Sequence, residues 1–176
     1  MSERVLREAD VPAAEKLLAS DPCWADNGER PGWVLDSISG ELDGEHSALG
    51  SFDGSELRGF ASFNFVAGAD RTGAISCVAR ADEASGIAVL SAAVKQLSSG
   101  GARLIVAELP DVPEMAAYGD LLAMAGFEPE AHVSDYYAEG VAMRVLVARL
   151  ADNGESFPKT STPRSDPTAA TARDSA

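Results

Sequence analysis

The segment 79–109 constrains the fold most. It reads as the end of a strand, a turn, a helix, a Gly-Gly break and a second strand, in the sequence ARADEASGIAVLSAAVKQLSSGGARLIVAEL. Many nucleotide-binding units have this order and bind a phosphate at the helix N-terminus, where the first amide groups have no partner within the helix. In this turn, however, Asp82 and Glu83 stand where such a loop would have glycines and cations. The segment therefore predicts a phosphate-binding scaffold whose loop has the wrong charge.

The remaining sequence predicts one α/β domain at 1–150, followed by a tail. The second strand of the opening segment, at 102–109, is almost continuously apolar, which predicts burial on both faces. The other expected elements are an extended piece at 4–7, a helix from the cap Asp10 to about residue 20, a helical piece at 33–38, a hairpin about Asp53-Gly54, a strand at 72–80, helices at 86–97 and 114–125, and two extended runs about 138–140. This order predicts a mixed sheet with helices on its faces. The tail, 151–176, is rich in Pro, Ser, Thr and Ala and is expected to be disordered.

Charge and cysteine content exclude several classes of function. The 14 basic and 28 acidic residues give a net charge of -14, which opposes binding to nucleic acid or to anionic membranes. The two cysteines, Cys23 and Cys77, form no CxxC pair, so we expect reduced thiols and no structural metal site. Without an apolar run long enough for a signal peptide or a membrane span, the sequence predicts a cytoplasmic protein.

A second set of features lies near the end of the domain. In order, these are Gly126-Phe127 after a helix, the pair Tyr136-Tyr137, the turn Glu139-Gly140 and a last apolar strand at 145–150. Together with the strand–turn–helix–strand unit at 75–109, they resemble the GNAT acyltransferases, the acyl-CoA-dependent N-acyltransferase superfamily, over residues 4–150. The resemblance implies a mostly antiparallel central sheet with helices on both faces, in which the strands at 72–80 and 102–109 splay apart to form a cleft.

The resemblance also implies where the co-substrate, acetyl-CoA or another acyl-CoA, would bind. Its pantetheine arm would pair with the free strand edge, and its pyrophosphate would sit on amides of the following loop and helix start, in a motif Gln/Arg-x-x-Gly-x-Gly/Ala. The positions that match are Ser76, Cys77, Val78, Ser85, Gly86, Ile87 and Ala88. Gly86 and Ala88 fill the fourth and sixth motif positions, whereas Glu83 departs from the first.

The acidic turn would weaken such a site. A unit charge ~4 Å from a phosphate costs about 4 kcal/mol at an effective dielectric constant of 20. We expect this repulsion to persist unless Asp82 and Glu83 turn to solvent or pair with Arg80 or Arg103.

Three residues are candidates for the chemistry. Family members often carry a tyrosine four residues before the glycine of Gly-Phe as the general acid; here that residue is Leu122, and Tyr118 lies one helical turn earlier. Glu108 ends a strand beside the expected splay, where a carboxylate could hold an amine or take its proton. Tyr137 of the aromatic pair could point into the acceptor pocket. Each also has a structural alternative, namely core packing for the tyrosines and a solvated strand end for Glu108.

Two further positions also have two interpretations. Trp24 and Trp33 flank the loop ADNGERPG, a region that forms a lid over the acceptor in the resembled family. The alternative is that both rings anchor a long loop to the core. Cys77 has small apolar neighbours and no nucleophile motif, which favours a packed core thiol.

The leading hypothesis is an acyl-CoA-dependent N-acyltransferase, most simply an acetyltransferase, in which a small primary amine attacks the thioester directly. A second hypothesis keeps acyl-thioester chemistry but takes the acyl group from another donor, such as a carrier protein, and the acidic charge disfavours it. A third is a non-catalytic GNAT-like module that binds a small molecule or a partner chain in the same cleft. By analogy with the family, a homodimer could form through the last strands.

Overall fold

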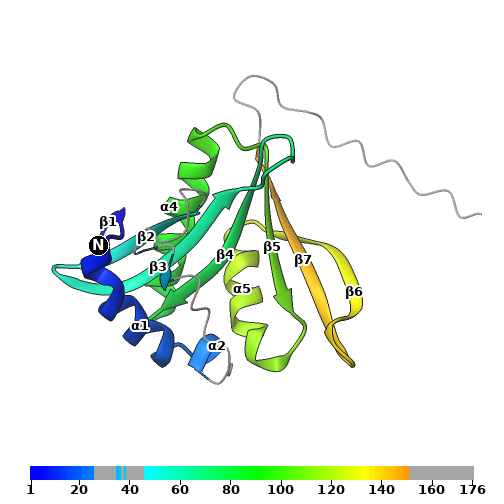
Figure 1. The fold of residues 1–176 in the computed structure, drawn as a ribbon, viewed down its shortest axis with the longest axis horizontal. Helices are drawn as coiled ribbons and strands as arrows, with labels where there is room; N and C mark the ends of the chain where they lie inside the picture. The colour runs from blue at the N-terminus through cyan, green and yellow to red at the C-terminus, as the bar shows by residue number, and fades with distance from the viewer. Residues whose placement is uncertain (26–34, 37, 39–45, 151–176) are drawn as a thin grey trace, which may run out of the picture.

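The structure is a computed structural model that describes residues 1–25, 35–36, 38 and 46–150 (Figure 1). Its elements are β1 (Ser2–Val5), η1 (Glu8–Asp10), α1 (Val11–Ser20), α2 (Pro22–Ala25), β2 (His46–Asp53), β3 (Glu56–Phe65), β4 (Thr72–Arg80), α4 (Glu83–Ser99), β5 (Leu104–Pro110), η2 (Pro113–Met115), α5 (Ala116–Met124), β6 (Glu128–Ala138) and β7 (Val141–Arg149). The predicted tail at 151–176 lies outside the described residues, as do residues 33, 34 and 37 of the helical piece predicted at 33–38; residues 35, 36 and 38 are helical.

The strands form one sheet in the order β1-β2-β3-β4-β5-β7-β6. Every neighbouring pair is antiparallel except β4 and β5, which are parallel. The β2–β3 hairpin turns at Asp53-Gly54 as predicted, because Gly54 adopts a φ of 60° that side chains disfavour. The predicted mixed, mostly antiparallel sheet is confirmed.

Helices cover both faces of the sheet, as expected (Figure 1). On one face, Leu17 and Leu18 of α1 pack with buried residues of β2, β3 and β4. On the other face, α4 and α5 share a larger core with the inward residues of β4, β5 and β7. No helix among the described residues is long and apolar enough to cross a bilayer.

Strand β5 departs from the prediction of burial on both faces. Ile105, Ala107 and Leu109 are buried against the helices, but Val106 is only half-buried and Glu108 is exposed. The apolar Val106 therefore does not face a second core. Its side of the strand borders the hollow in which the candidate site lies.

Helix α4 begins earlier than expected, at Glu83 instead of Gly86. Asp82 is extended, with φ -157° and ψ 168°, and its carboxylate accepts a hydrogen bond from the amide of Ser85, which is the usual geometry of an N-cap. The capped helix leaves only Ala81 and Asp82 between it and β4.

Candidate active site

The site begins where β4 and β5 separate. The two strands pair only from Thr72 opposite Leu104 to Ile75 opposite Ala107, although β4 continues to Arg80. On the other side of β4, Cys77 pairs with Ser62 and Ile75 with Phe63, so Ser76 is the extra residue of a β-bulge. Because a bulge increases the local twist, the end of β4 turns away from β5. The stretch predicted to form a free edge, 76–78, therefore lies at this splay.

A hollow of about 430 Å³ opens at the splay. Its lining residues come from three strands, β4, β5 and β6, and a loop; they are Val66, Ala74, Ile75, Ser76, Val106, Glu108 and Tyr137. The walls are mostly apolar, and Glu108 supplies the negative charge. Two of the three predicted catalytic residues, Glu108 and Tyr137, are thus brought together although they lie on different strands.

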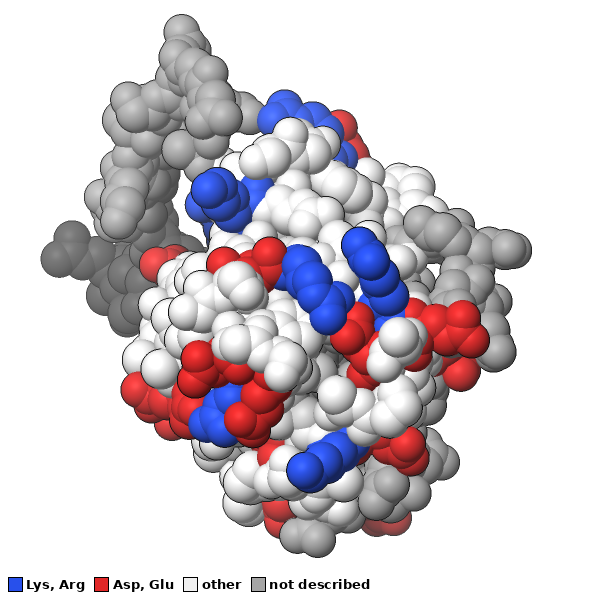
Figure 2. All heavy atoms as spheres, turned by 90° about the vertical axis from the view of Figure 1, so that its left-hand side faces the viewer, with Lys and Arg blue, Asp and Glu red and all other residues white. Residues whose placement is uncertain are grey.

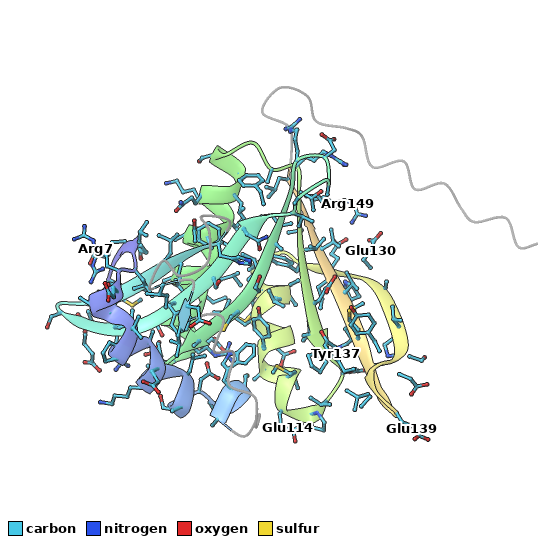
Figure 3. All side chains as sticks on the ribbon, in the orientation of Figure 1. Arg7, Glu114, Glu130, Tyr137, Glu139 and Arg149 are labelled. Atoms are coloured by element: carbon cyan, nitrogen blue, oxygen red, sulfur yellow. The ribbon has the colours of Figure 1, made fainter. Side chains whose placement is uncertain are left out.

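Tyr137 lies on β6, the strand that pairs with β7, and away from Glu139 at the hairpin tip (Figure 3). Partial burial raises the pKa of its phenol, and the nearby Glu108 carboxylate and Tyr136 raise it further. Its ring also contacts Tyr136 edge-on, with centroids 5.1 Å apart. The Tyr137 hydroxyl is therefore a hydrogen-bond donor at neutral pH, within the electrostatic reach of Glu108.

The structure does not bring Tyr118 to this hollow. Its side chain on α5 is 2% exposed, and its ring lies 5.9 Å from that of Trp24. Burial holds the pKa of its phenol well above the usual value. Within the described part of the chain, its buried hydroxyl has no hydrogen-bond partner. Tyr118 is thus a core residue with an unsatisfied polar end.

The carboxylate of Asp82 is paired, but with a residue that the sequence did not suggest. One oxygen accepts from the Ser85 amide at 2.8 Å, and the other contacts Nη2 of Arg58 on β3 at 2.7 Å. The Ser85 amide first, and then Arg58, lower the pKa of Asp82, so this carboxylate is ionised and partly neutralised. Glu83 is exposed.

The two arginines predicted as partners bind elsewhere. Arg103 contacts Asp70 at 3.1 Å, and Arg80 donates from Nη2 to the carbonyl oxygen of Ala117 at 3.0 Å. The stem of Arg80 also lies on Gly86, since a Cβ added at Gly86 would stand 2.7 Å from Cδ of Arg80. Gly86 thus allows a close approach, but the atoms that approach belong to Arg80.

Of the other predicted motif residues, Ser85 is buried, and Ile87 and Ala88 are half-buried.

The edge of β4 beyond the bulge is also occupied. The indole Nε1 of Trp24 donates to the carbonyl oxygen of Val78 at 2.7 Å. The carboxylate of Asp21 accepts from the amide of Arg80 at 2.8 Å and from the amide of Cys23 at 2.9 Å. Sequence reasoning missed Asp21, whose partner Arg80 lies 59 residues away. An extended cofactor would therefore have to displace one of these side chains to pair with this edge.

Neither cysteine has the character of a nucleophile. Cys77 is fully buried, and desolvation raises the pKa of its thiol well above the usual range. The pKa of Cys23 is raised to about 11, first by burial and then by the charge of Asp21. Cys77 is a packed thiol on β4, where it pairs with Ser62 of β3.

Solved structures share this fold. A protein of the GNAT family from Desulfovibrio desulfuricans superposes with a TM-score of 0.76 and 18% identity, over 85% of this chain and 99% of that chain. The chain has the GNAT fold. The aminoglycoside 6'-N-acetyltransferase from Enterococcus faecium matches with a TM-score of 0.69 and 11% identity, over 88% of this chain and 100% of that one. An acetyltransferase from Bacillus subtilis, solved in complex with CoA, matches with a TM-score of 0.64 and 16% identity, over 85% and 98%.

At these identities, the GNAT neighbours establish the fold and leave the activity to be argued from the site. No family model matches this sequence, and no curated protein matches it. The predicted GNAT resemblance is confirmed at the level of architecture.

Proposed function

We propose that this GNAT-fold protein is an acyl-CoA-dependent N-acyltransferase, most simply an acetyltransferase, that acts on a small primary amine. The observation that carries the proposal is the hollow at the β4–β5 splay, where Glu108 and Tyr137 face one space beside the bulge at Ser76. A polar pair in a concave, mostly apolar site at the point where strands separate is a common arrangement for a small-molecule site.

The residues of the hollow suit the amine. The carboxylate of Glu108 would attract an ammonium group and take the proton that the nitrogen must lose before it can attack a carbonyl. The phenol of Tyr137, kept protonated, would donate a hydrogen bond within the same space. Val106 and Ala74 would contact the carbon skeleton of the amine. Overall, the amine gains the acyl group, the thiol of CoA is released and one proton is given up.

Direct attack by the amine is supported by the state of the nearest thiol. Cys77 adjoins the bulge, but it is fully buried and its raised pKa disfavours the thiolate that a covalent mechanism would need. The charge also favours a cationic acceptor, since the chain carries a net charge of -14. On the side of the molecule shown in Figure 2, basic side chains stand beside acidic ones and form no single basic patch.

A second candidate is a GNAT-like module without catalytic activity that binds a small molecule or a partner chain in the cleft. The observation in its favour is the occupation of the β4 edge by Asp21 and Trp24. If this arrangement never opens, no extended cofactor can pair with Val78. The two candidates differ in whether CoA binds at all.

The test is amine-dependent release of free thiol. The full chain is mixed with acetyl-CoA and a panel of small primary amines, and the thiol of CoA is titrated with a chromogenic disulfide. Glu108→Gln should lower kcat/KM by about 10²- to 10⁴-fold, as expected for loss of a general base. The matched control is Glu114→Gln, the same chemical change at an exposed η2 residue outside the hollow (Figure 3). Equal effects of the two substitutions, or no amine-dependent release, would contradict the proposal.

A further inference from the structure

Two polar groups of the β4 backbone point into the splay. Residues two apart on a strand present their N–H and C=O groups to the same side, so Val78 and Arg80 share an edge. Both groups have side-chain partners from the α1–α2 region, namely Trp24 for the Val78 carbonyl oxygen and Asp21 for the Arg80 amide. The chain thus satisfies with its own side chains the edge that an added strand or a strand-like ligand would use.

The two partners differ in how firmly they are held. Asp21 is 1% exposed and also accepts from the amide of Cys23, which fixes both of its oxygens. Trp24 is only partly buried and makes its single N–H bond to Val78. Displacement of Trp24 from Val78 therefore breaks one hydrogen bond and its ring contacts, whereas displacement of Asp21 would leave two backbone amides without a hydrogen-bond partner.

The closed arrangement leaves one polar group unsatisfied. The ring of Tyr118 lies 5.9 Å from the ring of Trp24, and its buried hydroxyl has no partner among the described residues. Such a buried hydroxyl lowers the stability of the state that contains it. The bond between Trp24 and Val78 does not involve this hydroxyl, so the hydroxyl can be removed without a change in that bond.

We propose that Trp24 is a latch on the cofactor slot. An extended ligand with secondary amides, such as the pantetheine arm of CoA, displaces the indole and donates its own N–H to the carbonyl oxygen of Val78. Asp21 stays in place and keeps the amide of Arg80 satisfied. This proposal rests on the proposed function only in the identity of the ligand. The latch accounts for a GNAT fold in which side chains of the same chain pair with the β4 edge.

The test compares the affinity of CoA for the wild-type chain and for Trp24→Phe by isothermal titration. The smaller phenyl ring occupies part of the space of the indole and lacks the N–H donor, so the ligand no longer competes for the carbonyl oxygen of Val78. Because one neutral hydrogen bond of the closed arrangement is lost, CoA should bind Trp24→Phe about 2- to 12-fold more tightly than the wild type. Tyr118→Phe is the matched control, since it trims a neighbouring ring by one polar atom and leaves the bond to Val78 intact; its affinity should stay within about twofold of the wild type.

A second readout follows the latch itself. The chain has two tryptophans, so Trp33→Phe leaves Trp24 as the only indole. Saturation of that variant with CoA should shift the emission to longer wavelength as the indole leaves its partly buried position for water. Thermal melting of each variant confirms that it is folded.

Each outcome decides between the latch and the activity. Saturable binding of CoA with unchanged Trp24 emission and equal affinity in Trp24→Phe overturns the latch and leaves the acyltransferase proposal standing. Tighter binding in Trp24→Phe without acyl transfer to any amine supports the latch and overturns the activity. No binding to either folded protein at millimolar CoA overturns both.

Discussion

The charge at the N-terminus of α4 gives the sharpest prediction for the cofactor site, and Asp82→Asn is the substitution that tests it. Asp82 caps the helix through the Ser85 amide and contacts Arg58 through its other oxygen. Asparagine caps helices about as well as aspartate, so the substitution removes the charge and keeps the helix start. Any change in the binding of a phosphate-bearing ligand then reflects electrostatics.

The magnitude follows from the exposure of Asp82. Its side chain is 46% exposed, which places it near the water-like limit of screening. A unit charge about 4 Å from a phosphate then costs about 1 kcal/mol, well below the figure for a dielectric constant of 20. We therefore expect CoA to bind Asp82→Asn about 5-fold more tightly than the wild type. Salt should reduce the difference, since exposed charges are screened.

The assay is isothermal titration of CoA at low ionic strength, with melting curves beside it. Asp82→Asn should melt within about 2 °C of the wild type, whereas Asp82→Ala loses the cap, about 1 kcal/mol, and should melt about 2 to 4 °C lower. Arg58→Gln leaves the Asp82 charge without its partner and should weaken binding. An unchanged or weaker affinity in Asp82→Asn would refute the placement of the phosphates at this helix end.

Three further predictions follow from single contacts. Tyr137→Phe should lower turnover about 2- to 12-fold through loss of one donor. Because the pKa of Tyr137 is raised in the folded protein, any alkaline loss of wild-type activity due to this phenol should have its midpoint above pH 10 and should be absent from the pH–rate profile of the variant. Gly59→Ala would place a Cβ 2.9 Å from the carbonyl oxygen of Ser85, backbone against backbone, and should lower the free energy of unfolding by about 1 to 3 kcal/mol; unchanged denaturant curves would count against this packing. The pKa of Asp82 is lowered in the folded protein, so the ionised carboxylate stabilises the fold fully above about pH 4, and this stabilisation is lost as the pH falls through the pKa of the folded state. The difference in melting temperature between wild type and Asp82→Ala should therefore shrink in acid. A difference that stays constant with pH would contradict the role of Asp82 as the helix cap.

Local sequence signals predicted most of the fold. The turn at Asp53-Gly54 and the strand at 72–80 were expected where the structure has them, because turn chemistry and residue alternation act over a few residues. The start of α4 was placed three residues late. The pattern of Asp82 before Ser85 is an N-cap signal, but the interpretation of ADEASG as a turn puts the expected start at Gly86.

The site could be predicted only in part. Strand order and family resemblance brought Glu108 and Tyr137 to the splay, but the contacts that close the slot join segments far apart in the chain. Trp24 and Val78 are separated by 54 residues, and Arg58 and Asp82 by 24. Nothing in the residues around Trp24 specifies a carbonyl partner on a distant strand, so only the assembled fold shows it.

The most direct test of the acyltransferase proposal is electron density from crystals of the full chain grown with CoA. We expect an extended pantetheine arm along β4, between Val78 and Glu108, with the indole of Trp24 displaced from the Val78 carbonyl oxygen and the thiol end at the hollow. Density for CoA elsewhere on the protein, or an empty splay with Trp24 still bonded to Val78 at saturating CoA, would contradict it.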